Sequence, residues 1–172
     1  MPYVYARKYN YKGIETLQTN VLRILERDMP AELALIATET GSTQLATPAE
    51  YLKAHKPNPT LPVIVVEPDE EDNVESEDGS GINEQNILDI TIVGEQSEDS
   101  AQLAVNIMRR KRAVTNILWS AKESDLLLGI THTPALWDIR GGRYAWGRAN
   151  NIYEWSVRNL KLVANYSEVV NV

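Results

Sequence analysis

The chain of 172 residues has no cysteine, no phenylalanine and only two histidines. The lack of cysteine excludes disulfides, thiolate nucleophiles and thiolate metal ligands, so stability must come from packing and from partners. No apolar run approaches the ~20 residues that a membrane span needs, and the start Met1-Pro2-Tyr3 lacks the apolar region of a signal peptide. We therefore expect a soluble protein that is made in the cytoplasm and has no contact with a membrane.

Motifs for catalysis and for metal binding are also missing. His55 and His132 have no second ligand at a recognised metal spacing, and no serine lies in a nucleophile-elbow setting. Gly141-Gly142 lies between two arginines but lacks the pattern of a phosphate-binding loop, which favours a hairpin turn. We assign no catalytic residue, no metal ligand and no cofactor, and we expect that the protein is not an enzyme.

An acidic segment is the most informative feature that is present. Between residues 67 and 84 there are carboxylates but no lysine or arginine: Glu67, Asp69, Glu70, Glu71, Asp72, Glu75, Glu77, Asp78 and Glu84. The chain has a net charge of −7 from 24 acidic and 17 basic residues, so these nine account for all of the excess. Their spacing does not match a calcium loop. Repulsion among them predicts a solvated, flexible loop insertion over residues 67–86.

Two helices follow from the spacing of apolar residues. A period of three and four predicts an amphipathic helix over residues 14–27 that ends near Pro30, and a longer helix from about Ser97 to Trp119. Threonine before proline at Thr47-Pro48 is typical of a helix start, so a short helix is predicted there.

The other segments have the character of strands. Residues 63–66 and 87–93 predict two strands on either side of the acidic segment. Residues 135–139, the expected turn at Gly141-Gly142 and a long run over 152–166 predict two more. The parity of apolar residues changes within the last run, which predicts a bulge near Arg158-Asn159.

Together these elements predict one α+β domain over residues 1–172. Its mainly antiparallel sheet has about four strands and packs against two main helices, with the acidic loop between the first two strands. Residues 1–13 and 167–172 lack clear periodicity and are expected to be arms that become ordered on assembly.

Four consecutive cations lie on the predicted long helix: Arg109, Arg110, Lys111 and Arg112. At about 100° per residue they wrap around the helix and cannot form one flat basic stripe. Such a cluster can neutralise phosphates, so a nucleic-acid-binding module is one interpretation. The chain is acidic overall and has no recognition-helix motif, which favours pairing with the carboxylates of a neighbouring subunit. Aromatic residues in the last strands are expected in a core or a subunit seam: Trp137, Tyr144, Trp146, Tyr153 and Trp155.

This order of elements resembles the tail terminator (tail completion) proteins of tailed bacteriophages. The resemblance is carried by the helix around residues 17–25, the segment Leu61-Pro62-Val63-Ile64-Val65-Val66, the strand 87–93, the helix 101–119, and the closing strand that ends Leu160-Lys161-Leu162-Val163-Ala164. It implies a small structural subunit of the virion that forms a six-membered ring at the neck, caps the tail tube and joins it to the head connector. The chain departs from that family in its long acidic segment and in residues 31–59.

The resemblance also implies partners. These are other copies of the chain in a homo-oligomeric ring, the tail tube and the head-side connector, with DNA passing through the lumen without specific binding and assembly in the host cytoplasm. Under it, acidic residues face the lumen or a basic partner: Asp69, Glu70, Glu71, Asp72, Glu75, Glu77 and Asp78. The cluster from Arg109 to Arg112 would then pair across the seam. A head-to-tail adaptor or stopper of the neck is the alternative, and a nucleic-acid-binding module is the second alternative.

Overall fold

The first helix continues beyond the proline at which the sequence predicts its end. In the computed structural model, which describes residues 5–169, α1 spans Gly13–Thr40 and contains Pro30. Pro30 lies on the exposed face, while Leu33 and Ile36 extend the buried stripe. The predicted end near Pro30 is therefore wrong, because burial of the next two turns outweighs the ~3 kcal/mol cost of an internal proline.

The segment after α1 contains a strand where a short helix was predicted. β1 spans Glu50–Leu52 and pairs in parallel with the start of β2. The N–H of Ala49 donates to the carbonyl of Pro62 at 2.7 Å, and Tyr51 packs against the core. The helix prediction at Thr47-Pro48 is wrong because pairing with a buried strand overrides a local start signal.

The acidic segment is a β-hairpin, so the predicted flexible loop over residues 67–86 is wrong. β2 spans Val63–Glu75 and β3 spans Gly81–Ser97, and the two are antiparallel from the pair Val63 and Val93 to the pair Glu75 and Ile82, with a bulge at Asp69. On its other side β3 pairs with the last strand along its whole length, so it offers β2 a fixed edge. The acidic side chains of β2 remain exposed to solvent, while its backbone forms hydrogen bonds with β3.

The second long helix confirms its prediction. α2 spans Ser100–Ser120, and the side chain of Asp99 caps it by accepting from the N–H of Gln102 at 3.0 Å. The one-turn helix α3, Glu123–Leu126, follows. Among the described residues no helix is both long and apolar enough to cross a membrane.

The last two strands form a hairpin that is longer than predicted. β4 spans Leu136–Ala149 and β5 spans Ile152–Val169. The predicted turn at Gly141-Gly142 is wrong, because β4 runs through both glycines. Gly141 lies opposite Leu160, the residue after Asn159. Gly141, Gly142 and Asn159 all have positive φ, and a Cβ at Gly141 would come within 2.8 Å of the Asn159 carbonyl oxygen. The register against β3 shifts here, which confirms the predicted bulge near Arg158-Asn159.

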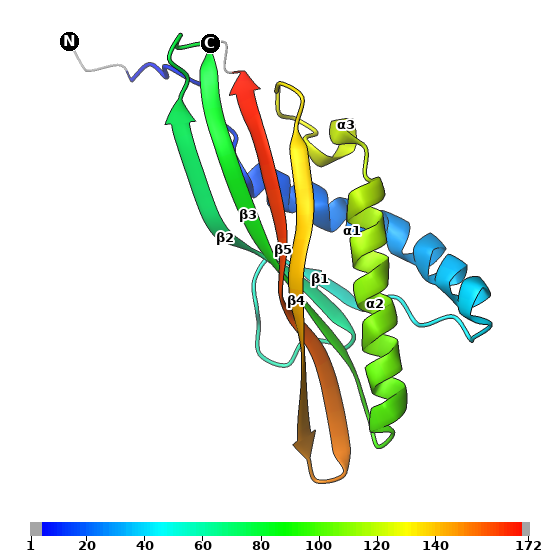
Figure 1. Cartoon of the computed structure of the whole chain (residues 1–172). Helices are drawn as coiled ribbons and strands as arrows, with labels where there is room; N and C mark the ends of the chain where they lie inside the picture. The colour runs from blue at the N-terminus through cyan, green and yellow to red at the C-terminus, as the bar shows by residue number, and fades with distance from the viewer. Residues whose placement is uncertain (1–4, 170–172) are drawn as a thin grey trace.

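The strands form one sheet in the order β1-β2-β3-β5-β4, antiparallel except for β1 with β2 (Figure 1). α1 and α2 pack together against the face that carries Leu88, Ile90 and Leu162. The predicted α+β class, with a mainly antiparallel sheet and two main helices, is confirmed, but the sheet has five strands because of β1.

The two predicted arms differ in the structure. Residues 5–12 have no regular secondary structure, whereas Ser167, Glu168 and Val169 belong to β5. The C-terminal arm is therefore wrong for residues 167–169. The remaining parts of both arms, 1–4 and 170–172, lie outside the described residues.

Candidate functional site

The sheet ends in two open edges. β1 covers only the first three residues of β2, so β2 from Glu67 onward is one edge, and β4 is the other. Within residues 5–169 no backbone hydrogen bond reaches the outer side of either stretch. An edge with unpaired N–H and C=O groups is a template for another strand, so both edges are candidate contact surfaces.

The outer half of β2 is acidic on both of its faces. Toward the helices, Glu71 accepts from the N–H of Ile14 at 2.7 Å, and Glu75 pairs with Lys8 at 2.6 Å. On the opposite face, Asp69 pairs with Lys161 at 3.2 Å. The exposed residues Glu70 and Asp72 also lie on this face, opposite residues of β3 that point away from the core: Ile87 and Gln85.

The turn of this hairpin is held by one carboxylate. Asp78 accepts from the hydroxyls of Ser76 and Ser80 and from the N–H of Ser80, at 2.7 to 3.0 Å. These hydrogen bonds, chiefly those from Ser80, lower the pKa of Asp78 to about 2. Glu77 is exposed beside it. The tip of the hairpin therefore keeps its negative charge at any physiological pH.

One of the nine carboxylates is buried beneath the hairpin. The side chain of Glu84 accepts from the amide of Asn86 at 3.0 Å and lies in contact with the carboxyl group of Glu168 from β5. Both carboxyl groups are at most 5% exposed, and each has one buried oxygen without a partner. Burial, and then the neighbouring Glu168, raises the pKa of Glu84 to about 7. Glu84 is therefore part of the interior and not of the charged surface.

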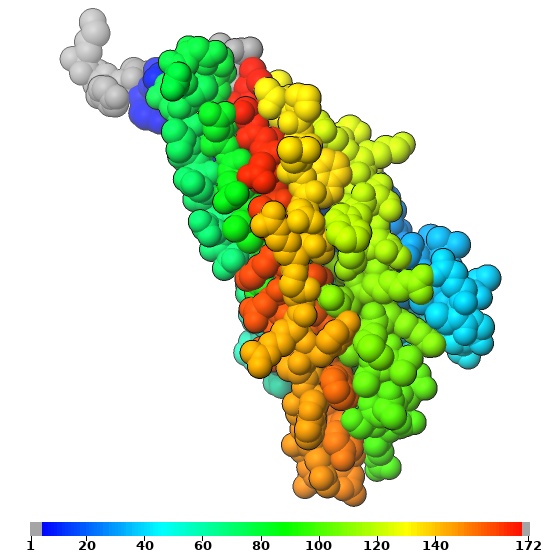
Figure 2. Space-filling view, viewed as in Figure 1, coloured from blue at the N-terminus to red at the C-terminus, as the bar shows by residue number. Residues whose placement is uncertain are grey.

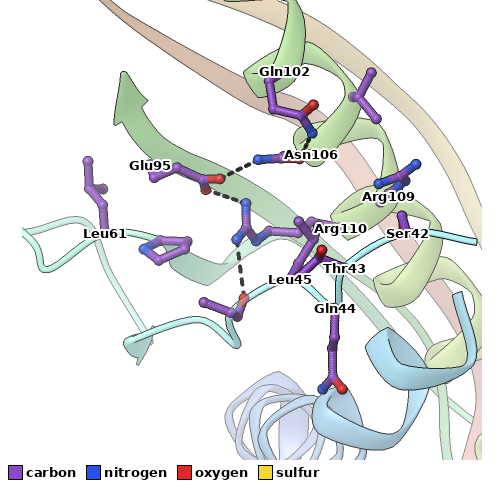
Figure 3. A pocket seen from close by; sticks show the side chains of 13 residues that line it. Ser42, Thr43, Gln44, Leu45, Leu61, Glu95, Gln102, Asn106, Arg109 and Arg110 are labelled. Atoms are coloured by element: carbon purple, nitrogen blue, oxygen red, sulfur yellow. Dashed lines mark hydrogen bonds and ion pairs between the residues drawn. The ribbon is translucent and has the colours of Figure 1, made fainter. Parts of the chain in front are cut away.

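Arg110, which the sequence groups with the surface cations, is buried. Its guanidinium pairs with Glu95 of β3 and donates to the carbonyl of Ala46 at 3.2 Å, and its side chain is 1% exposed (Figure 3). Asn106 donates to the same Glu95 at 2.6 Å. Although burial alone would raise the pKa of Glu95, its own backbone N–H and Arg110 hold that pKa below its usual range. Arg110 therefore joins α2 to β3 and to the segment after α1.

Arg110 also lies at the wall of a cleft of about 840 Å³ between α2 and residues 42–46. Gln102 donates to Asn106 at 2.8 Å inside this cleft, and Arg109 lies at its rim. The side chains of Gln102, Asn106 and Glu95 form a series of hydrogen bonds that ends at Glu95. This hydrogen-bond series fixes the position of α2 and provides no nucleophile with an adjacent base.

The other three members of the cation cluster point in different directions, which confirms that the four do not form one basic stripe. Arg112 pairs with Glu39 of α1, and the ammonium group of Lys111 lies 5.6 Å from the ring centre of Tyr144. Two of the four cations therefore meet carboxylates of their own chain. A contact of this cluster with a neighbouring subunit stays a prediction for Arg109, Lys111 and Arg112, but Arg110 has no surface with which to make it.

The β4 edge is basic and partly apolar, and of its residues only the aromatic ones were predicted from the sequence to take part in a contact. It carries Arg140, Arg143 and Arg148, all exposed, with Asp138 as its one acidic residue. Leu136 is 77% exposed at one end and Trp146 is 61% exposed toward the other. Figure 2 shows this edge as a continuous band from the side of α3 down to the tip of the β4–β5 hairpin.

The aromatic residues of this hairpin divide between the core and the surface. Trp137 donates to the carbonyl of Leu118 at 3.0 Å and Trp155 to the hydroxyl of Ser100 at 3.1 Å, and both pack against the core. Trp146 and Tyr144 stay exposed on β4. The expectation of core packing is confirmed for the first pair, and a subunit seam stays a prediction for the second.

The chain is thus a small α+β protein whose single sheet has one acidic and one basic edge. No family model matches the chain, and neither does any curated protein. Among solved structures it is similar to a chain of "Virion of native gene transfer agent (GTA) particle", with 16% sequence identity, 92% of this chain and 99% of that chain covered, and a TM-score of 0.45. A likeness at that level does not establish a common fold or role.

Proposed function

We propose that this chain is a structural protein of a phage-like virion, namely the subunit of the terminator ring that caps the tail tube at the neck. The observation that carries the proposal is the sheet with two open edges of opposite charge. Such a subunit offers two different surfaces to its neighbours, and contact between unlike surfaces leads to rings when the rotation closes. The order of elements, which resembles that of tail terminator proteins, supports a position of this ring at the neck.

The proposal includes no catalytic step. The buried ionisable side chains of the described residues contact other protein groups: Arg110 pairs with Glu95, and Glu84 lies against Glu168. Among the same residues there is no group of three or more His, Asp or Glu side chains placed to hold a metal ion. The acids of β2 and the arginines of β4 lie along the sheet edges, where they suit contact with other macromolecules.

The nucleic-acid alternative gains little from the structure. It relied on four adjacent cations, of which Arg110 is buried and Arg112 pairs with Glu39. DNA in this proposal passes the ring without specific contact. The adaptor or stopper of the same neck remains the alternative that the following experiment separates from the terminator.

Electron micrographs of particles assembled without this chain test the proposal. A terminator stops growth of the tail tube, so its absence should give overlong tails without heads, and supply of the wild-type chain should restore tails of uniform length. Tails of normal length beside heads that lose their DNA would favour the adaptor and contradict the terminator. Intact, infectious particles would overturn a structural role in the virion altogether.

A further inference from the structure

The two open edges carry opposite charge over comparable lengths. From Glu67 to Glu75 β2 has six carboxylates and no cation, whereas β4 has three arginines and a single Asp138. Two of these acids, Glu70 and Asp72, and two of these arginines, Arg140 and Arg143, are exposed and near the sheet margins. Opposite charge on two margins of one sheet gives a second copy of this chain a complementary surface at each side.

Side-chain orientation brings these groups to the same face of the sheet. Arg140 lies directly opposite Lys161, and Lys161 contacts Asp69 and Asp89 on the face away from the helices. The register places Glu70 opposite Ile87, two residues before Asp89, and therefore on that face. The acids of one edge and the arginines of the other therefore lie on the same face of the sheet. Through β3 and β5 the register places Glu70 level with Asp138, so a second copy must be shifted along the strand direction to bring its acids next to the arginines.

Strand direction also suits a contact between the edges. Because β2, β3, β5 and β4 alternate in direction, β2 and β4 run antiparallel to each other. A second copy placed beside the first in the same orientation therefore brings its β2 antiparallel to β4 of the first. That arrangement continues the pattern of the sheet from one subunit into the next.

We propose that the acidic β2 edge of one copy docks against the arginine-bearing β4 edge of the next copy. Two acidic edges repel each other, and so do two basic edges, so the charges permit the head-to-tail contact and oppose both symmetric ones. The inference rests on the proposed ring function and names the two surfaces that build the ring. It also assigns the acidic hairpin to the seam between subunits.

Charge reversal on each edge, followed by sedimentation velocity, tests this contact. The variants are Arg140→Glu with Arg143→Glu on β4, and Glu70→Lys with Asp72→Lys on β2. Glu70, Asp72 and Arg143 have no ion-pair partner among the described residues, and Arg140 pairs only with Asp138 beside it, so the fold should persist. Exposed positions away from the edges give matched controls, Lys122→Glu and Glu98→Lys.

Each edge variant should raise the concentration for half-assembly at least about tenfold at low salt, and the controls should not. A chain that carries both reversals restores the complementarity and should assemble again, which excludes misfolding as the cause of the loss. If neither reversal weakens assembly, or if the wild-type chain stays monomeric in this assay, the proposed contact between the edges is overturned. Both results leave the proposed ring function standing. The ring function fails separately, through intact particles made without the chain.

Discussion

The buried carboxyl group of Glu84 makes a quantitative prediction about stability and pH. In the unfolded chain its pKa is near 4.5, and in the folded chain burial and Glu168 raise it to about 7. Between these two values the folded chain binds more protons than the unfolded chain, so the free energy of unfolding falls as the pH rises from about 4.5 to about 7. Above that window the cost of the buried charge is complete and constant.

The size of this cost follows from the pKa of Glu84. A rise from 4.5 to about 7 corresponds to about 3 kcal/mol, and relaxation around a group only 5% exposed reduces the expected effect to ~1–3 kcal/mol. Glu84→Gln removes the ionisable group while keeping an oxygen that accepts from Asn86. Its new amide can also donate to the buried carboxyl oxygen of Glu168 that has no partner. The substitution should therefore stabilise the fold above pH 7.

Urea unfolding followed by tryptophan fluorescence at pH 4.5 and pH 8 measures this effect. Glu84→Gln should gain ~1–3 kcal/mol at pH 8 and almost nothing at pH 4.5, so that its stability depends less on pH than that of the wild type. Glu70→Gln removes an exposed carboxylate from the same hairpin and should give no such gain. An equal gain at both pH values, or a loss at pH 8, would refute the assignment of a buried, protonated carboxyl group.

Three more substitutions test the packing and backbone of the fold. Arg110→Ala should cost ~2–4 kcal/mol in urea titrations because it strands Glu95, whose side chain is 33% exposed; no loss would exclude a structural ion pair. Pro30→Ala restores an N–H inside α1 and should raise the stability by ~1–3 kcal/mol in thermal unfolding, whereas a decrease would contradict an exposed, tolerated proline. Gly141→Ala should lower the free energy of unfolding by ~1–3 kcal/mol, because Gly141 has positive φ and its new Cβ would lie 2.8 Å from the Asn159 carbonyl oxygen. Gly147→Ala should be nearly neutral, because no atom lies within 4 Å of a Cβ there. Similar shifts of the thermal midpoint for both variants would be inconsistent with the bulge.

Elements with a strong local signal could be predicted from the sequence. α2 has a capping aspartate and a buried stripe from Leu103 to Leu118, both of which can be recognised from spacing alone. The bulge at Arg158-Asn159 could be predicted because a change of parity would otherwise turn apolar side chains to solvent. In both cases one element carries the information that fixes its own conformation.

Elements that depend on a distant partner could not be predicted. The acidic half of β2 forms a strand because β3 is already held by β5, and β1 forms because β2 is buried beside it. The candidate contact surface was missed in the same way. A contact surface can be inferred from Arg140, Arg143 and Arg148 only when β4 is known to be a sheet edge. The contact of Glu84 with Glu168 could not be predicted either, because the two residues are 84 positions apart in the sequence.

Native mass spectrometry of the purified wild-type chain, at moderate salt and rising concentration, is the most direct test of the central claim. It measures whether copies join head to tail and close into a ring. The account predicts one assembled species with a mass that is a whole multiple of 19.3 kDa and that stops growing once the ring is complete. A mass of 19.3 kDa at every concentration, or an assembly that lengthens without limit, would contradict closure of a ring through the two edges of the sheet.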